Sequence, residues 1–370
     1  LFRSEGLKHI WGRTDLIPLW VADMDFATAP FVTDAIRKRC ENEVLGYTGK
    51  PDSYYNAIIN WVKQRYDLVV TKEMINFVPG IVPGIGMAMN CFTQKGDKVM
   101  IQPPVYHPFA WVTTRNERTL VTNPLKWENG MYRMDLDTFR EQIKGCKLFI
   151  LCNPHNPGGV VWTEAELRAI ADICYDEKVL VFSDEIHADL TLPPHTHRPF
   201  ATVSEKARMN SVTFMSPSKA FNMPGLSASH ALIFNEDLRK RFRIYMDAGE
   251  LDMGHVFAFL SVEAAYSHGT EWLDQCLAYI QGNIDFVDDF LKNHAPKIKA
   301  IRPEASYLVW LDCRELKLSQ KDLNEFFVDK AHLALNDGEM FGKEGIGFMR
   351  LNVASPRCII EKAMKQLAED

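Results

Sequence analysis

The sequence predicts an α/β fold in which a mainly parallel sheet lies between helices. Four short apolar runs have strand character, because each is rich in branched or aromatic residues and ends at a turn signal. They are "KVMIQPP" (98–104), "KLFILCNP" (147–154), "VLVFSDE" (179–185) and "SVTFMSP" (211–217). A helical pattern separates the second run from the third. This β-α-β alternation is typical of parallel strands covered by helices on both faces.

The helical pattern between those strands is "TEAELRAIADICYDEK" (163–178). It begins with Thr163 and has Glu166 three positions later, which is the capping-box arrangement that satisfies free N–H groups at a helix start. Its apolar positions repeat with helical spacing and share one face. They are Leu167, Ile170, Ala171 and Cys174.

The C-terminal part of the chain has a different order of elements. The helical pattern "EWLDQCLAYIQGNIDFVDDFLKNH" (271–294) is followed by a strand-like run, "SYLVWLD" (306–312). This part of the chain continues with a second helical pattern (319–331), a predicted strand "GFMRLNVA" (347–354) and a last helix. We therefore predict a smaller α+β domain from about residue 280 onward, with the long helix running from one domain into the other.

Composition excludes several classes of protein. The chain has 370 residues, is 46% hydrophobic and 24% charged, and carries a formal net charge of −6, which gives no reason to expect nucleic-acid binding. No apolar run reaches the roughly 18 residues that span a bilayer. The first residues lack both a signal-peptide core and a starting methionine, so we expect further residues before them.

Cysteine and histidine positions favour a cytoplasmic protein without a metal. None of the eight cysteines forms a C-x-x-C pair, which indicates reduced thiols. The "HTH" run from His195 to His197 allows a metal site as an alternative, but we favour a polar loop because it follows two prolines.

Polar side chains gather where three of the predicted strands end. These groups are Asn153 with Asn156, Asp184 with Glu185, and Ser216 with Ser218 and Lys219. Each group alone has an ordinary explanation: a turn-rich loop, a helix cap or a surface lysine. Ligands collect beyond the carboxyl ends of parallel strands, so their coincidence at successive strand ends favours a binding site.

An amide, a carboxylate and a lysine that converge above a parallel sheet suit pyridoxal phosphate. The lysine amine condenses with the aldehyde of the cofactor, and the carboxylate keeps the pyridine nitrogen protonated so that the ring accepts electrons. The amide can donate to the phenolic oxygen. Lys219 is therefore expected to serve as a nucleophilic amine.

Here the sequence resembles the fold-type I pyridoxal phosphate enzymes, the superfamily of aspartate aminotransferase. Asp184 follows Asn156 by 28 residues and Lys219 follows Asp184 by 35, as in that superfamily. Further motifs resemble one branch, the MalY/PatB-type C–S lyases. They are "WVADMDF" (20–26), "GYT" (46–48), "PPVYHPF" (103–109), "NPHNPGG" (153–159), "SDEIHADL" (183–190), "SPSKAFNMPGL" (216–226) and "FMRLNVASPR" (348–357).

The resemblance implies a domain organisation and an assembly. A large cofactor-binding domain with a mainly parallel seven-stranded sheet would span residues 38–279, and a small domain would combine residues 1–37 and 280–370. The protein would be a homodimer with a shared active site, in which Tyr47 reaches the cofactor phosphate of the other subunit. The ordinary alternative for Tyr47 is a packed aromatic side chain near a turn.

The resemblance also implies roles for residues around the cofactor ring. Lys219 would hold the cofactor covalently and act as the base at the substrate Cα, and Asp184 would pair with the pyridine nitrogen. Asn156 would contact the phenolic oxygen and the substrate. His187 stands where many aminotransferases carry a tyrosine that serves this oxygen. Tyr106 would stack on the ring.

Two further regions would bind charged groups. Within the resemblance, Arg350 would hold the substrate carboxylate by a bidentate fork, with Arg357 as the less favoured candidate. The stretch "PGIVPGIGMAMNCF" (79–92) leads into a helical pattern, and the start of a helix offers free N–H groups to a phosphate. Ile81 and Val82 are the expected donors. The hydroxyls of Ser216 and Ser218 are added candidates, with turn formation as their alternative.

Three functions remain open from the sequence. The favoured one is a C–S β-lyase that cleaves cystathionine or related thioethers to pyruvate, ammonia and a thiol. The second is an aminotransferase on the same fold, and fold alone does not separate the two. The third is a regulatory role through protein contact, for which the sequence carries no recognisable mark.

Overall fold

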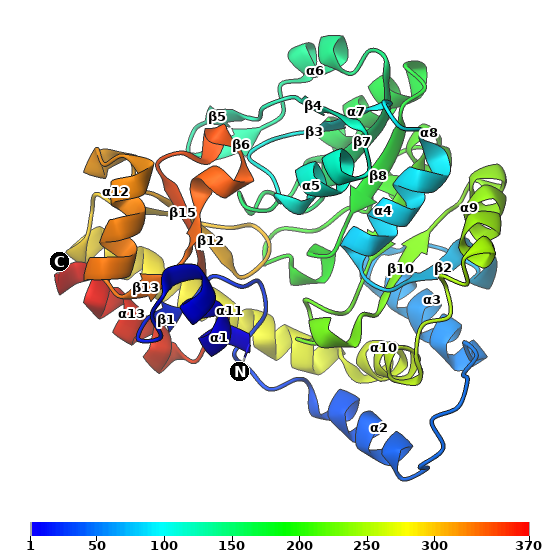
Figure 1. Ribbon diagram of the computed structural model, residues 1–370, viewed down its shortest axis with the longest axis horizontal. Helices are drawn as coiled ribbons and strands as arrows, with labels where there is room; N and C mark the ends of the chain where they lie inside the picture. Colours follow the sequence, from blue (N-terminus) through cyan, green and yellow to red (C-terminus); the bar gives the residue numbers. More distant parts are fainter. Residues whose placement is uncertain (1, 370) are drawn as a thin grey trace.

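The computed structural model describes residues 2–369, and a seven-stranded sheet forms its centre (Figure 1). The strands are β2 (Ile75–Val78), β3 (Lys98–Ile101), β4 (Thr119–Thr122), β7 (Cys146–Cys152), β8 (Leu180–Asp184), β9 (Ser211–Met215) and β10 (Ser229–Leu232). Their order is β2-β10-β9-β8-β7-β3-β4, and only β10 runs antiparallel to its neighbours. The predicted α/β class and mainly parallel seven-stranded sheet are confirmed, and the four quoted runs form β3, β7, β8 and β9.

Helices bury both faces of this sheet. They are α2 (Pro30–Cys40), α3 (Asp52–Tyr66), α4 (Ile81–Phe92), α5 (Pro108–Arg115), α6 (Leu136–Gln142), α7 (Glu164–Asp176), α8 (Glu205–Met209), α9 (Glu236–Ala248) and α10 (Val256–His268). Strand β7 shows the principle. Phe149 and Leu151 face the core under α6, α7 and α8, whereas Leu148 and Ile150 face the core under α4, α5 and α9. A parallel strand that is buried on both faces therefore has a nearly continuous apolar sequence.

The predicted capping box is present at the start of α7. The Thr163 side chain accepts a hydrogen bond from the Glu166 N–H, and the Glu166 carboxylate accepts one from the Thr163 N–H. Two free donors at the helix start are satisfied in this way, so the sequence signal located the start of α7 correctly.

The C-terminal part forms a second, antiparallel sheet. Its strands are β11 (Lys299–Ile301), β12 (Leu308–Asp312), β14 (Asn336–Asp337) and β15 (Phe348–Asn352), in the order β11-β12-β15-β14. The helices of this part are α11 (Thr270–His294), α12 (Gln320–Glu325) and α13 (Arg357–Glu369). This matches the predicted α+β character. Helix α11 crosses residue 280, and the exact domain boundaries stay a prediction.

The N-terminal residues lie against the C-terminal ones (Figure 1). After α1 (Phe2–Trp11), strand β1 (Ile17–Pro18) pairs in parallel with β13 (Leu333–Ala334). The small hairpin of β5 (Lys126–Glu128) and β6 (Met131–Arg133) completes the strands. Between residues 2 and 369, no helix combines the length and apolar character that a membrane span requires.

Candidate active site

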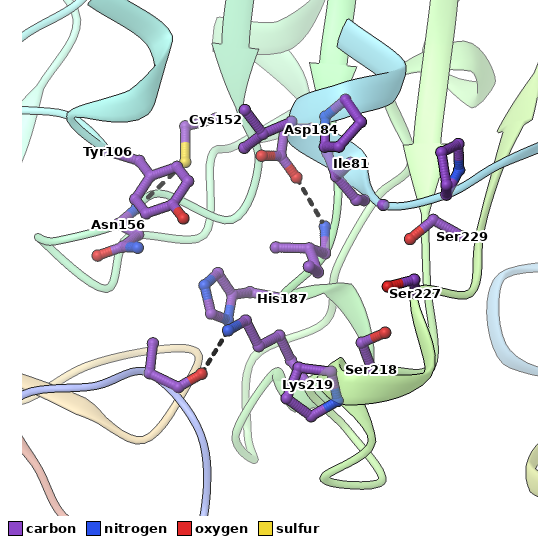
Figure 2. A pocket seen from close by; sticks show the side chains of 17 residues that line it. Ile81, Tyr106, Cys152, Asn156, Asp184, His187, Ser218, Lys219, Ser227 and Ser229 are labelled. Carbon is purple, nitrogen blue, oxygen red and sulfur yellow. Dashed lines mark hydrogen bonds between the residues drawn. The ribbon is translucent and has the colours of Figure 1, made fainter. Parts of the chain in front are cut away.

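A pocket of about 210 Å³ lies where β7, β8 and β9 end and α4 begins (Figure 2). It brings together eight of the residues that the sequence analysis singled out. They are Ile81, Val82, Tyr106, Asn156, Asp184, His187, Ser218 and Lys219. Parallel strands end at the same edge of the sheet, which is why residues far apart in the chain meet here.

Lys219 lies just beyond β9, and its amine reaches into the pocket (Figure 2). Its Nζ donates a hydrogen bond to the carbonyl oxygen of Ala22. Burial, together with the positive charge of Arg350, lowers the pKa of Lys219 to about 8. A lysine with such a pKa has a larger neutral fraction near neutral pH, and only the neutral amine is a nucleophile or a base.

Asp184 is the last residue of β8 and is 4% exposed. Its Oδ1 accepts a hydrogen bond of 3.1 Å from the Ile186 N–H. Burial raises the pKa of Asp184 to about 7, with a smaller rise from the neighbouring Glu185 charge. A buried carboxylate is costly to ionise without a cationic partner. A protonated ring nitrogen in the pocket would be such a partner.

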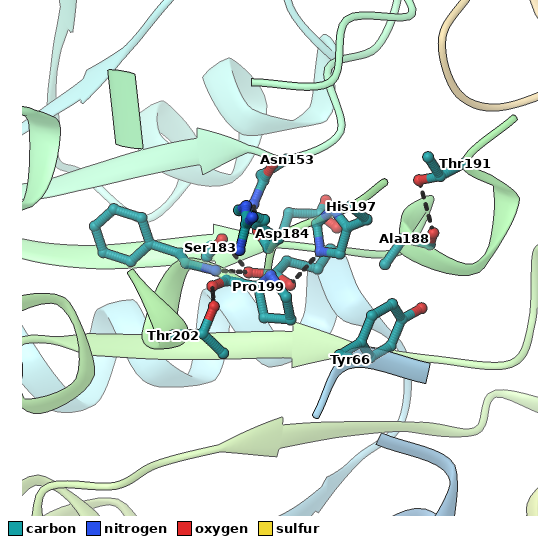
Figure 3. A network of polar contacts seen from close by, with 12 residues as sticks. Tyr66, Asn153, Ser183, Asp184, Ala188, Thr191, His197, Pro199 and Thr202 are labelled. Carbon is teal, nitrogen blue, oxygen red and sulfur yellow. Dashed lines mark hydrogen bonds and ion pairs between the residues drawn. The ribbon is translucent and has the colours of Figure 1, made fainter. Parts of the chain in front are cut away.

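Glu185, the residue after β8, belongs to a buried hydrogen-bond network that includes Ser183 and His197 (Figure 3). Its carboxylate accepts hydrogen bonds of 2.8 Å each from the Ser183 hydroxyl and the Phe200 N–H, and its Oε2 lies 2.8 Å from His197 Nε2. The side chains of Glu185 and His197 are 0% and 1% exposed. Successive side chains alternate along a strand, so anchoring Glu185 on one side fixes Asp184 on the other. His197 thus turns inward from the loop that the sequence analysis treated as polar.

Arg350 brings the second sheet to the site. It lies on β15, and its guanidinium donates to Asn156 Oδ1 at 3.0 Å, to Asn336 Oδ1 at 2.6 Å and to the Trp20 carbonyl at 3.1 Å. Burial lowers the pKa of Arg350 to about 10, so it stays cationic at neutral pH. Because Asn156 lines the pocket, this pair can present a fixed positive charge to a carboxylate beside it.

His187 and Tyr106 line the pocket as uncharged rings. Burial and the charges of Lys219 and Arg350 lower the pKa of His187 to about 3. Its Nδ1 is buried and has no hydrogen-bond partner within the described part of the chain. Buried polar atoms are normally paired, so this nitrogen is available to a ligand. Burial raises the pKa of Tyr106, which keeps its hydroxyl protonated.

The start of α4 suits an anion. Gly80 precedes the helix at φ +132°, and among residues 2–369 no side chain caps this end. Ile81 and Val82 occupy the first turn and line the pocket. The N–H groups of a first helical turn lack helical partners and carry positive partial charge. A phosphate at this point would satisfy them.

These residues fit pyridoxal phosphate. The pocket offers an amine of lowered pKa, a buried carboxylate without a strong cationic partner, an unpartnered ring nitrogen and a helix start for a phosphate. Four kinds of group that the cofactor needs are therefore present in one cavity.

Arg350 reaches the pocket only through Asn156 and is not part of its lining, and three further predicted residues also lie outside the lining. Ser216 donates to the Ala228 carbonyl at 2.7 Å, and its Oγ lies 2.8 Å from that of Ser218. The Tyr47 side chain is 98% exposed, so it does not make the contacts that a packed aromatic side chain would make. Arg357 donates to Asn283 Oδ1 at 2.8 Å, on α11.

Sequence reasoning missed several residues that line the pocket. They are Ala22, Cys152, Ile186, Pro224, Ser227 and Ser229, whereas Pro79, Gly80 and Pro83 belong to the stretch predicted to bind the phosphate. Cys152 carried a signal that could have found it, because it ends the strand beside Asp184. Ala22 carried no signal beyond the family motif at residues 20–26, because its contact with Lys219 joins residues 197 positions apart.

Comparison with known proteins places this geometry in a family. The family model described as aminotransferase class I and II matches residues 14–367. The chain belongs to this family. Cystathionine beta-lyase PatB of Bacillus subtilis (strain 168) is 38% identical over 97% of this chain and 93% of its own length. The resemblance to the MalY/PatB branch is thereby confirmed.

Two solved structures share the fold over the full length of this chain. A PLP-bound putative aminotransferase from Clostridium difficile 630 is 40% identical, with a TM-score of 0.97 over 100% of this chain and 95% of its own. The PLP-bound C-S lyase from Staphylococcus hominis is 34% identical, with a TM-score of 0.91 over 100% and 94% of the two chains.

Proposed function

We propose that the protein is a pyridoxal phosphate-dependent C–S β-lyase. It would cleave cystathionine or related cysteine thioethers by α,β-elimination, giving pyruvate, ammonia and a thiol. The observation that carries the proposal is the convergence of Lys219, Asp184 and the Asn156–Arg350 pair at one pocket. The 38% sequence identity to a cystathionine beta-lyase, over 97% of this chain, supports the choice of reaction.

The residues of this chain would divide the holding of the cofactor. The N–H groups of Ile81 and Val82, with the Ser218 hydroxyl, would bind the phosphate. Asp184 would pair with the ring nitrogen, and Lys219 would hold the aldehyde carbon covalently. When bound, pyridoxal phosphate supplies a conjugated ring that accepts the electron pair left at the substrate Cα.

Lys219 would remove the Cα proton once the substrate amine has displaced it. Its lowered pKa suits this task, because a base works best with a pKa near the working pH. Arg350 and Asn156 would fix the substrate carboxylate and Tyr106 would limit movement of the cofactor ring. These contacts would hold the Cβ–S bond roughly perpendicular to the ring, the orientation in which a thiolate leaves.

An aminotransferase is the second candidate, and one observation favours it. The family and one near structural neighbour carry that name. Lys219 and Asp184 would serve both reactions up to the loss of the Cα proton. The reactions separate afterwards, because a lyase expels the thiolate whereas an aminotransferase returns a proton and releases a keto acid.

We also propose a cytoplasmic homodimer with a shared active site. The segment at residues 42–51 has no helix or strand, and it exposes Val44, Leu45 and Tyr47 at 71%, 62% and 98%. Clustered exposed apolar side chains are typical of contact surfaces. A partner chain would bury them and place Tyr47 near the partner's phosphate site. The eight free cysteines agree with a reducing compartment.

A product assay with L-cystathionine, in the absence of any keto acid, tests the function. We expect pyruvate, ammonia and homocysteine in equal amounts over many turnovers, with none formed by Lys219→Ala. Conversion of one substrate per site, with further turnover only after a keto acid is added, would instead establish the aminotransferase.

A further inference from the structure

The chain between residues 19 and 28 crosses the site without forming a helix or a strand. Ala22 in this segment lines the pocket and accepts a hydrogen bond from Lys219. Backbone carbonyls that are withdrawn from water need other partners. The Leu19 carbonyl accepts from the Asn352 N–H, and side chains of the C-terminal sheet and of the turn that follows β9 donate to further carbonyls of the segment.

The C-terminal sheet supplies one set of donors. Arg350 donates to the Trp20 carbonyl at 3.1 Å. Asn352, two residues later on β15, donates to the carbonyls of Val21 and Asp23 at 2.6 Å each. One side of the segment is therefore attached to the strand that carries Arg350.

Asn222 supplies the other set, three residues after Lys219. Its amide donates to the carbonyls of Met24 and Phe26 at 3.0 and 2.7 Å, and its Oδ1 accepts from the Met24 N–H at 3.0 Å. Its own carbonyl accepts from the Thr28 hydroxyl at 2.7 Å. A single side chain thus makes three of the contacts that hold the segment.

The backbone at Asn222 suits only a few residue types. Its φ is +51°, in the left-handed region that asparagine, aspartate and glycine adopt most readily. Of these three, only asparagine has both amide donors and a carbonyl acceptor. Conformation and hydrogen bonding therefore select the same residue.

We propose that Asn222 is a positioning residue, which holds segment 19–28 so that this segment fixes Lys219 relative to Arg350. The role rests on the proposed function and acts through the segment, since Asn222 does not line the pocket. Trp20 contacts Arg350 and Ala22 contacts Lys219, so one short segment bridges the groups proposed to bind the substrate carboxylate and to move its proton. A displaced segment would weaken substrate binding more than it slows the chemical step.

The test uses the holoenzyme of Asn222→Asp. Aspartate keeps the size, the left-handed backbone and the acceptor for the Met24 N–H, but it places an oxygen against the two carbonyls. We expect amide hydrogen exchange in residues 19–28 to become about 10-fold faster, with a similar rise in KM and a kcat changed less than about 2-fold, as loss of buried hydrogen bonds implies. Visible absorption of the bound cofactor should stay unchanged.

Asn210→Asp is the matched control. Asn210 is also half-buried and donates its amide to a backbone carbonyl, that of Val179 at 2.7 Å, but it lies away from the segment. It should change neither exchange in residues 19–28 nor KM. If Asn222→Asp does not fold, Asn222→Gly keeps the backbone freedom and removes all three side-chain contacts, including the acceptor for the Met24 N–H, with the same direction of change expected.

Hydrogen exchange and kinetics test different parts of the proposal. Unchanged exchange in residues 19–28 would overturn it, and so would faster exchange with an unchanged KM, because Asn222 would then be only structural. Exchange does not depend on which reaction is catalysed. A failed lyase assay with faster exchange would therefore count against the proposed function and leave the attachment of the segment standing, with KM then measured for the transamination substrate.

Discussion

At the scale of single residues, burial prepares the side chains of the pocket for chemistry. Asp184 and Lys219 have their pKa values moved toward each other, to about 7 and about 8, because both are withdrawn from water. Burial disfavours the charged form of each group, so the acid becomes weaker and the base becomes weaker. The proposed cofactor would pair with one group and bond to the other.

The Asp184 pKa predicts how stability depends on pH in protein freed of cofactor. The pKa rises from 3.8 to about 7 on folding, so the stabilising contribution of Asp184 is complete below about pH 4 and is lost as the pH rises through about 7. The non-titrating variant Asp184→Asn should therefore unfold at a higher urea concentration than the unchanged chain at pH 8.

The same comparison at pH 4 is its control. At that pH the Asp184 carboxyl is protonated in the folded state, so the two proteins should differ much less in their free energies of unfolding. A difference that is equal at pH 4 and pH 8 would show that Asp184 is not a strongly shifted acid.

Residue contacts across the chain mark the limit of what the sequence could predict. Lys219, Asp184 and Asn156 end or follow apolar strands, so their convergence followed from local patterns and the topology of parallel sheets. The inward turn of His197 and the roles of Asn222 and Ala22 depend on partners that no local pattern identifies. His197 bonds to Glu185, 12 residues away, and Asn222 to a segment about 200 residues earlier.

At the scale of elements, helix α4 depends on the glycine that precedes it. Gly80 has φ +132° and ψ 157°, a conformation that is essentially restricted to glycine. A Cβ at this position would also lie 3.3 Å from Pro83 Cδ. The backbone freedom of one glycine therefore sets the direction in which the N–H groups of Ile81 and Val82 face the pocket.

Gly80→Ala should weaken cofactor binding. A side chain at such a backbone conformation brings a strain of about 1–3 kcal/mol. Rotation of the first turn of α4 would relieve this strain and move the N–H groups away from the phosphate, so the affinity for pyridoxal phosphate should fall about 10-fold. Equilibrium dialysis measures this affinity. Gly282→Ala, in the middle of α11 with a nearest contact of 3.4 Å, is the control and should bind normally. Equal affinities for both variants would remove α4 from the phosphate site.

Elements with strong local patterns were predicted from sequence, and weak ones were not. β7, β8, β9 and α7 carry long apolar runs or a capping box. Segment 19–28 forms no helix or strand, and side-chain donors add to a few backbone hydrogen bonds at Leu19 and Asp25 in holding it. Only the resemblance drew attention to this segment.

At the scale of the whole molecule, the site lies between two sheets of different kinds. The parallel sheet carries Lys219 and Asp184, and the antiparallel sheet carries Arg350. The exposed segment with Tyr47 lies outside both sheets. The proposed homodimer would add this third contribution to the site.

Mixed dimers test the sharing of the site. Tyr47→Phe and Lys219→Ala should each have low activity, whereas a mixture after subunit exchange should regain part of the original activity, because one site of each mixed dimer carries neither change. Sedimentation establishes the dimer, and mixing two tagged Lys219→Ala samples measures the exchange and the background. No recovery despite demonstrated exchange would place Tyr47 outside the site.

Cleavage of the Cβ–S bond is the central claim, and carbon NMR observes it directly. L-cystathionine labelled with ¹³C at the Cβ of its cysteine half is incubated with the holoenzyme in the absence of a keto acid. If Lys219 starts an α,β-elimination, the label appears in the methyl group of pyruvate and increases through many turnovers. A label that remains bonded to sulfur, in a keto acid formed once per site, would contradict the account and assign the protein to transamination.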